Sequence, residues 1–269
     1  MSGPLPTKEV EKPWGRDTLP APFTAPAGKK IGEIWFEPPP ELPELLVKYI
    51  FTSEPLSVQV HPSDAQTLAK NMGRQGKEEC WVIVDAEPGA KLGIGFKEHV
   101  DAQHMRAAAL DGSIEHLMEW HTVSPGDFYY IPANTVHAIG AGISLIEVQQ
   151  NSDITYRLYD YGRPRELHLD ESVKIAIGDP YEGKWKGKAA EGTSVSLVPG
   201  PLFLLDQVAG LPSDDIASRY TGALLVIPRE GSVHVAGQEV VPGGCAVASR
   251  LTDVTFANLG LCLLAAPYR

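Results

Sequence analysis

Four side chains of types that bind metal ions lie beside predicted β-strands in the N-terminal part of this 269-residue chain. Gln59 and His61 are two residues apart within residues 56–62, so the period of a strand places both on one face. Glu79 opens the next apolar run, and His137 follows a predicted strand, turn and strand. Two imidazole nitrogens with a carboxylate and an amide oxygen suit a borderline divalent cation such as zinc. This spacing predicts one metal site in a small β-barrel.

Strands must position these four residues, and the sequence predicts them in the right places. Residues 46–61 alternate well enough for two strands. Strands at 80–85 and 90–96 flank a Pro-Gly turn at 86–89, and residues 121–148 return to strands. The candidate ligands are therefore expected on neighbouring strands of one barrel.

Short helices are predicted between the strands. Residues 63–70 form one, with Ser63 or Asp64 as its N-cap. Residues 99–119 carry apolar side chains at helical spacing, and an Asp-Gly pair divides them into two helices. Residues 170–177 form a further short helix that begins at an aspartate cap and stops at a glycine.

The chain is expected to have two β domains. Residues 1–45 are rich in Pro and Gly and form an extended lead-in with one strand at 31–36. The polar, glycine-rich segment 183–192 is the candidate linker. It is followed by strand-like runs at 194–198, 202–208, 222–227, 232–236, 245–248 and 262–265. We therefore predict domains at 1–182 and 183–269, with the metal site in the first only.

Composition limits the partners. The net charge is −11, from 23 Lys and Arg against 34 Asp and Glu, which argues against nucleic acid and anionic membranes. No apolar run has the length of a membrane span, and the N-terminus lacks the pattern of a secretory signal. The three cysteines are widely spaced in apolar runs, as reduced core thiols are. We expect a cytoplasmic protein; the oligomeric state stays open.

Two segments resemble the conserved motifs of the cupin superfamily. Residues 126–137 resemble the second motif, with Asn134 where glycine is usual. The Gln59 and His61 pair resembles the first motif, whose usual pair is two histidines. The resemblance implies a mainly β fold: a cupin (jelly-roll) β-barrel with a few short helices, plus a second, smaller cupin-like barrel without a metal site.

Residues 56–62, 76–81 and 146–157 are more specifically similar to class I mannose-6-phosphate isomerases, in a short, bacterial-like form. They occur in the family's order, and the likeness covers roughly residues 10–180. It implies a zinc-dependent isomerase that interconverts mannose 6-phosphate and fructose 6-phosphate, so the partner is a small sugar phosphate. It also implies one Zn²⁺ per chain, held by Gln59, His61, Glu79 and His137.

Moving a proton between C1 and C2 of a ring-opened sugar needs a base and stabilisation of the enediolate oxygens. By the resemblance, Glu147 is the best carboxylate for the proton transfer, and Arg157 offers a planar fork for enediolate oxygens or a phosphate. Lys77 is expected beside the metal, where it would contact the same substrate. The alternatives are an internal ion pair between Glu147 and Arg157 and a solvated Lys77.

Further substrate contacts are expected around the metal. Ser57 lies two residues before Gln59 and so on the same strand face. Arg163 and Arg165 add positive charge that could meet a phosphate, or they could belong to a solvated loop. The same resemblance therefore implies substrate binding by Ser57, Lys77, Arg157 and Arg163.

Two other classes of protein compete with the isomerase. The first is an oxidative cupin that uses iron, manganese or nickel; Gln59 argues against it, because such sites more often have a second histidine. The second is a non-catalytic protein that binds a sugar phosphate; the presence of Lys77, Glu147 and Arg157 argues against it. The sequence also departs from the family: only the Lys and Glu of its His-Lys-Pro-Glu segment remain at Lys77 and Glu79, and its large helical insertion is reduced to residues 99–119.

Overall fold

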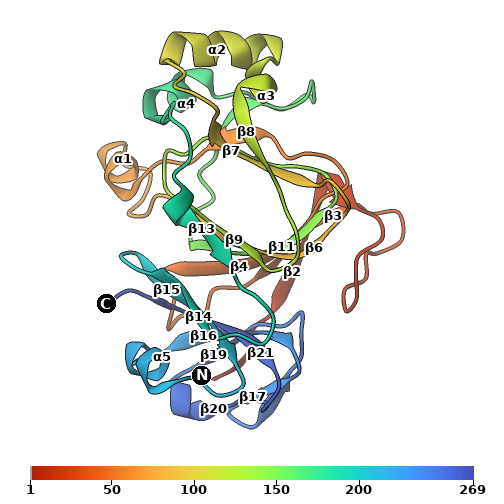
Figure 1. Ribbon diagram of the computed structural model, residues 1–269, viewed down its shortest axis with the longest axis vertical. Helices are drawn as coiled ribbons and strands as arrows, with labels where there is room; N and C mark the ends of the chain where they lie inside the picture. Colours follow the sequence, from red (N-terminus) through yellow and green to blue (C-terminus); the bar gives the residue numbers. More distant parts are fainter. Residues whose placement is uncertain (1) are drawn as a thin grey trace.

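The computed structural model describes residues 2–269 and is built mainly from β-strands stacked in layers (Figure 1). Three helices lie at one end of the long axis: α2 (Ala102–Asp111), α3 (Ile114–Leu117) and α4 (Leu169–Ile175). A barrel of two sheets lies next to them, and the C-terminal strands form the opposite end (Figure 1). The prediction of a mainly β fold is confirmed.

Two antiparallel sheets form the first barrel. The larger has the strand order β13 (Lys186–Lys188), β9 (Asp127–Ile131), β6 (Glu79–Ala86), β11 (Ile143–Gln150), β4 (Leu45–Phe51), β3 (Ile31–Phe36) and β2 (Thr7–Arg16). The smaller has the order β12 (Tyr156–Tyr159), β5 (Val58–Val60), β10 (His137–Ile139), β7 (Lys91–Phe96) and β8 (Met118–Thr122). Buried side chains from both sheets, including Trp81 and Ile94, fill part of the space between them.

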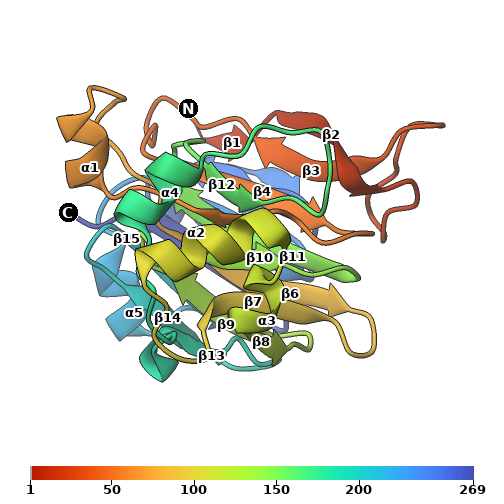
Figure 2. The same ribbon diagram turned by 90° about the horizontal axis from the view of Figure 1, so that it is seen from above.

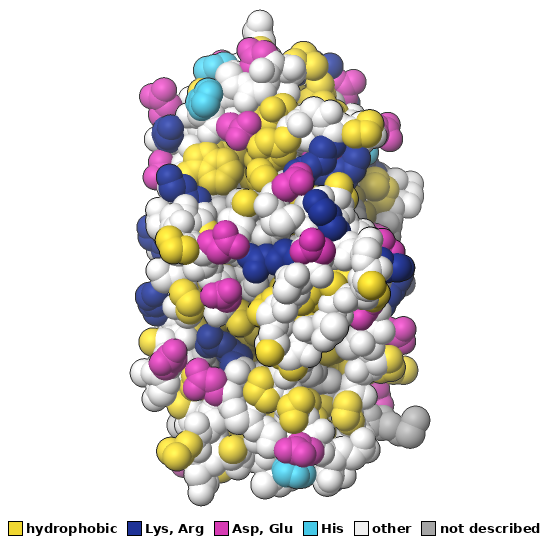
Figure 3. Space-filling view, turned by 90° about the vertical axis from the view of Figure 1, so that its right-hand side faces the viewer, with side chains coloured by type: hydrophobic (Ala, Val, Ile, Leu, Met, Phe, Trp, Pro, Cys, Tyr) yellow, Lys and Arg dark blue, Asp and Glu magenta, His cyan; other side chains and the backbone are white. Residues whose placement is uncertain are grey.

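Helices cover the outer face of the five-stranded sheet, where α2 and α4 lie side by side (Figure 2). The cover is apolar, because Met105 of α2 and Ile175 of α4 pack in one cluster with Val58 of β5. This leaves the barrel interior free for polar residues. On the face shown in Figure 3, basic and acidic side chains are intermingled.

The C-terminal strands form two further sheets. One has the order β1 (Gly3–Pro4), β19 (Ala246–Ala248), β16 (Leu224–Glu230), β21 (Leu261–Pro267), β15 (Phe203–Ala209) and β14 (Val195–Pro199). The other has the order β18 (Gln238–Val240), β17 (Val233–Val235) and β20 (Val254–Thr255). The remaining elements are α1 (Asp64–Ala69), α5 (Asp214–Arg219) and the 3₁₀ turns η1 (Gly183–Trp185) and η2 (Leu251–Asp253).

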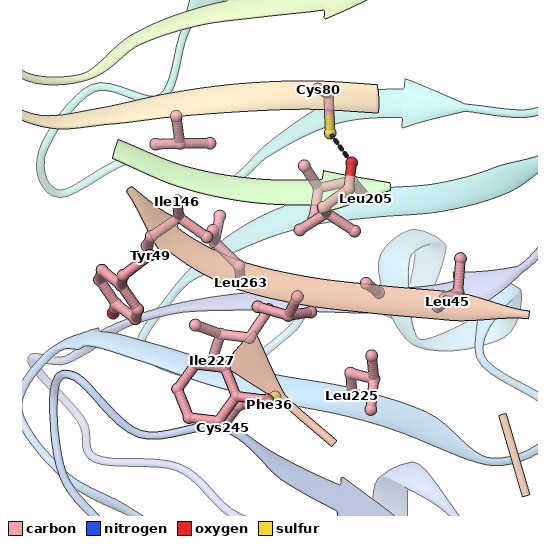
Figure 4. Close-up of a cluster of buried hydrophobic side chains, with 14 of the residues drawn as sticks. Phe36, Leu45, Tyr49, Cys80, Ile146, Leu205, Leu225, Ile227, Cys245 and Leu263 are labelled. Carbon is pink, nitrogen blue, oxygen red and sulfur yellow. Dashed lines mark hydrogen bonds between the residues drawn. The ribbon is translucent and has the colours of Figure 1, made fainter. Parts of the chain in front are cut away.

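The largest apolar core lies between the two halves of the chain. Phe36, Leu45 and Ile146 from the first half pack with Leu205 and Leu263 from the second (Figure 4). Two strand pairs also cross the predicted boundary, because β1 pairs with β19 and β13 pairs with β9. Domains at 1–182 and 183–269, and a second barrel of cupin type, stay predictions.

Several local predictions are confirmed. Ser63 is the N-cap of α1, and its hydroxyl accepts from the backbone N–H of Gln66. Gly112, at φ 83°, ends α2 in the left-handed conformation that favours glycine. The three cysteines, Cys80, Cys245 and Cys262, are free and buried.

Other local predictions need correction. The lead-in contains the ten-residue strand β2, which the sequence does not reveal because its edge position leaves half of its residues exposed. Helix α5 was likewise not predicted. The helix predicted over 170–177 is α4, which spans Leu169–Ile175. It does not reach Ile177, because the N–H of that residue bonds to the Asn134 carbonyl and not to a carbonyl of the helix. Within residues 2–269, no helix combines the length and the apolar character that crossing a membrane requires.

Candidate active site

The four predicted ligands come together between the two sheets of the first barrel. Gln59 on β5 is the register partner of His137, which opens β10, and His61 follows β5 directly. Glu79 opens β6 in the opposite sheet. The ligand atoms of His61, Glu79 and His137 lie within 4.8 Å of one another, and Gln59 Nε2 is 3.3 Å from His137 Nε2. One strand pair and the facing sheet therefore converge on a single point.

Both histidines are held in the form that binds metal. Nδ1 of His61 lies 2.8 Å from the Ile154 carbonyl and Nδ1 of His137 lies 2.9 Å from the Thr135 carbonyl. A carbonyl only accepts, so each Nδ1 carries the proton and each Nε2 keeps its lone pair for the site. Burial lowers the pKa of His137 to about 4, and burial followed by the Lys77 charge lowers the pKa of His61 well below its usual value. Both rings are neutral at pH 7.

Glu79 is the carboxylate of the site and is 1% exposed. Its Oε1 is 3.3 Å from His137 Nε2, and its Oε2 is 3.7 Å from His61 Nε2 and 2.7 Å from Lys77 Nζ. Burial and the Glu147 charge raise its pKa to about 7, against the opposing charge of Lys77. Across residues 2–269, Glu79 Oε1 has no hydrogen-bond donor, and Oε2 has only the ion pair with Lys77. The free lone pairs of Oε1 beside two imidazole nitrogens fit a metal ion.

Gln59 completes this set through Ser57. The Ser57 hydroxyl donates to Gln59 Oε1 at 3.1 Å, and Nε2 of the amide faces the two imidazoles. Turning the amide by half a turn would direct Oε1 at the metal position and Nε2 at Ser57, which can also accept. The donor set of two nitrogens and two oxygens therefore fits the predicted metal.

A cavity of about 280 Å³ opens beside the ligands and has several charged side chains in its wall. Ser57, Lys77, Glu147 and Arg157 all line it, as the sequence predicts. Lys77 is 5% exposed, so it is buried and not solvated. Burial alone would lower its pKa, but the carboxylates Glu79 and Glu147 outweigh burial and raise it. Lys77 is a fixed cation beside the metal position.

Lys48 is a site residue that the sequence did not reveal. It lies on β4 opposite Glu147 on β11, and its Nζ donates to Glu147 Oε1 at 3.0 Å and to Gln149 Oε1 at 2.5 Å. Trp81 Nε1 donates to the other oxygen of Glu147 at 3.0 Å. Burial alone would raise the pKa of Glu147. The charges of Lys48 and Lys77 and these hydrogen bonds outweigh burial and lower the pKa to about 2. A lysine inside an otherwise apolar strand was the available signal.

The arginines divide into two groups. Arg157 and Arg165 line the cavity, and the structure shows no ion pair between Arg157 and Glu147 in the part of the chain it describes. Arg157 Nη1 donates to the Glu166 carbonyl, whereas its buried Nε has no partner among residues 2–269. Arg165 donates from Nε and Nη2 to the two carboxylate oxygens of Asp160, each at 2.5 Å. Arg163 points elsewhere: it donates to Asp160 and to a backbone carbonyl and is not part of the cavity wall.

The lead-in also contributes to the cavity, which the sequence did not predict. Lys12 of β2 and Glu33 of β3 line the cavity and form an ion pair at 3.2 Å. Trp35 Nε1 donates to Glu33 at 2.6 Å. The edge hairpin therefore closes one side of the site.

Known proteins resemble this chain in sequence and in fold. No family model matches it. The mannose-6-phosphate isomerase of Streptococcus mutans is 38% identical over 167 residues, which are 59% of this chain and 52% of that protein. The mannose-6-phosphate isomerase ManA of Bacillus subtilis is 42% identical over 137 residues, 49% of this chain and 43% of that protein. The chain thus spans about half the length of the curated relatives it matches.

The solved structures extend the likeness in fold to the whole chain. The mannose 6-phosphate isomerase from Bacillus subtilis has a TM-score of 0.79 at 24% identity, over 98% of this chain and 99% of that one. A mutant of phosphomannose isomerase from Salmonella typhimurium has a TM-score of 0.76 at 16% identity, over 100% of both chains. The family resemblance seen in the sequence is thereby confirmed: the chain has the fold of phosphomannose isomerases and, over about half its length, a sequence similar to mannose-6-phosphate isomerases.

Proposed function

We propose that this chain is a zinc-dependent isomerase that interconverts mannose 6-phosphate and fructose 6-phosphate. The observation that supports it best is the neutral pair His61 and His137 with the buried carboxylate Glu79, set beside a cavity lined with cations. The two nitrogens and the carboxylate suit zinc, and bound zinc would polarise a substrate oxygen. The three buried free cysteines are also compatible with a reducing compartment such as the cytoplasm.

The cavity's cations can hold a sugar phosphate. The buried Nε of Arg157 has no hydrogen-bond partner among residues 2–269. Burial lowers the pKa of Arg157, and the positive charge of Arg165 lowers it as well. Two convergent guanidinium groups favour an anion between them, so we assign Arg157 and Arg165 to the phosphate or to the enediolate oxygens. Lys77 would hold a sugar oxygen near the metal, and the Ser57 hydroxyl would hold a second. Arg163 supports the region through Asp160 instead of touching the substrate.

Glu147 is our candidate for the proton transfer between C1 and C2. In the structure, hydrogen bonds from Lys48 and Trp81 to its two oxygens make it a weak base. A pKa closer to the working pH would serve catalysis better. We infer that the substrate's oxygens draw Lys48 away from Glu147, which raises the basicity of the carboxylate when the sugar is in place.

Metal analysis and an activity assay on one preparation test this proposal. We expect one zinc per chain, turnover of mannose 6-phosphate in a coupled assay, loss of activity on chelation and recovery with zinc. No turnover with zinc at full occupancy would refute the isomerase and leave a protein that only binds sugar phosphates. Oxygen consumption with bound iron, manganese or nickel would instead establish an oxidative cupin.

A further inference from the structure

A second cavity, of about 420 Å³, lies between the two halves of the chain. It is on the opposite face of the seven-stranded sheet from the candidate active site. Tyr49 and Ile146 line this cavity, whereas their neighbours Lys48 and Glu147 line the other, as the alternation of a strand requires. Its volume and its place between two packed halves are those of small-molecule sites.

The walls of this cavity, which we call the interlayer cavity, are mostly apolar and partly aromatic. The ring of Phe23 lies 4.7 Å from that of Tyr49 and 5.2 Å from that of Phe51. Ile146 adds an aliphatic surface, and both Tyr49 and Ile146 lie at one side of the core in Figure 4. These walls suit an apolar body of about one or two rings.

Two cations line the interlayer cavity: Lys188 of β13, which is already paired with Asp127 at 2.7 Å, and Arg229 of β16. Its Nη1 donates to the Ala189 carbonyl and to Gln207, and within residues 2–269 it forms no ion pair with a carboxylate. Burial lowers its pKa although Glu230 opposes this. A half-buried guanidinium without a carboxylate partner is stabilised by an anion that reaches its other N–H groups.

Ser144 supplies a second polar group. It is 1% exposed, and its hydroxyl has no hydrogen-bond partner in the described part of the chain. A buried hydroxyl without a partner costs free energy that a ligand oxygen would recover. The exposed carboxylates Glu191 and Glu230 also line the cavity and would repel a ligand of higher negative charge. Together these groups select a single negative charge.

We propose that the interlayer cavity binds a small amphipathic monoanion, an aromatic or branched apolar body bearing one carboxylate. Arg229 holds the carboxylate, Ser144 contacts an oxygen, and the aromatic wall covers the body. This site is separate from the sugar-phosphate cavity, so the proposal does not depend on the isomerase activity.

Calorimetric titration with 1-naphthaleneacetate and with its neutral amide tests the proposal. We expect one acetate ligand per chain, at least tenfold weaker binding of the amide, and no displacement of the acetate by mannose 6-phosphate. Arg229→Gln should weaken the acetate at least tenfold and leave the amide unchanged, because only the charge contact is lost. Arg250→Gln removes an exposed cation elsewhere and should change neither.

Nuclear Overhauser contacts keep the test valid if Arg229→Gln fails to fold. In the unmodified protein, the naphthyl protons should contact the rings of Phe23, Tyr49 and Phe51. The proposal is overturned by an absence of binding at millimolar ligand, by contacts to other residues, by displacement with mannose 6-phosphate, or by a folded Arg229→Gln variant that binds the acetate normally.

Discussion

The orientation of two imidazole rings decides what this site can bind. Backbone carbonyls at Ile154 and Thr135 accept the Nδ1 protons, so the Nε2 lone pairs of His61 and His137 face the same candidate metal position as Glu79. Burial keeps both rings neutral, and a neutral imidazole is the form that a metal requires. Hydrogen bonds to backbone carbonyls therefore orient both rings so that their Nε2 atoms could bind a metal.

Removing one ligand should separate metal binding from catalysis. We expect His137→Ala to lose both zinc and activity, whereas Arg157→Ala should keep stoichiometric zinc and lose at least about a hundredfold in turnover. Elemental analysis with the coupled assay measures both, and His121→Ala, a half-buried histidine of the same sheet, is the control. Stoichiometric zinc in His137→Ala would remove that residue from the ligand set, and full activity in Arg157→Ala would remove the arginine from the mechanism.

The lowered pKa of Glu147 predicts a pH-dependent stability. Its carboxylate ionises at about pH 2 in the folded chain and at about 4.5 when unfolded. It therefore stabilises the fold above about pH 4.5, by roughly 3 kcal/mol, and this contribution is lost as the pH falls towards 2. Urea unfolding should show Glu147→Gln less stable than the wild type at pH 7, with a gap that narrows in acid. A gap independent of pH would contradict the lowered pKa.

At the scale of elements, the strand register of β4 and β11 pairs Lys48 with Glu147 inside the sheet. Each charge is buried, at 5% and 3% exposure, so each depends on the other. On the opposite face of the same two strands, Tyr49 and Ile146 belong to the apolar core between the two halves of the chain. Strand alternation thus gives one sheet a charged face and an apolar face.

A double-mutant cycle should detect this dependence. Lys48→Met and Glu147→Gln should each cost roughly 3 kcal/mol, and the double variant should cost about 2 kcal/mol less than their sum. Urea unfolding at pH 7 measures the three variants. The exposed pair Lys29 and Glu11, 2.6 Å apart, is the matched control and should show no measurable coupling. Additive losses at Lys48 and Glu147 would show that the buried pair does not act as a unit.

At the scale of the whole molecule, the two halves share their largest core. Phe203 is fully buried and packs in the same cluster as Tyr130 of the first half, at a ring distance of 5.9 Å. A half that separated from its neighbour would expose this core to water. We therefore expect the two halves to unfold together in one cooperative transition.

Two probes can test that cooperativity. Tryptophan fluorescence reports mainly the first half, which holds four of the five tryptophans, and thiol labelling followed at Cys262 reports the second. We expect both probes to give one urea transition, which Phe203→Ala shifts by about 3–5 kcal/mol for both. Leu211→Ala, at a site 68% exposed, should leave the transition unchanged. Two separate transitions in the wild type would show that the halves unfold independently.

The local features of this protein follow from short stretches of its sequence. A two-residue period placed Gln59 and His61 on one strand face, and cap and glycine signals located α1 and the break after α2. The motif order also pointed to the isomerase-like fold that the structure has. These features depend on neighbours within about ten residues, so the chain order carries them.

The contacts between residues distant in the chain become visible in the three-dimensional structure. It paired Lys48 with Glu147, placed Arg165 but not Arg163 in the cavity wall, and added Lys12 from a strand that the sequence hid. Each of these depends on the register between strands far apart in the chain. Burial and packing of whole sheets set that register, and no local pattern records it.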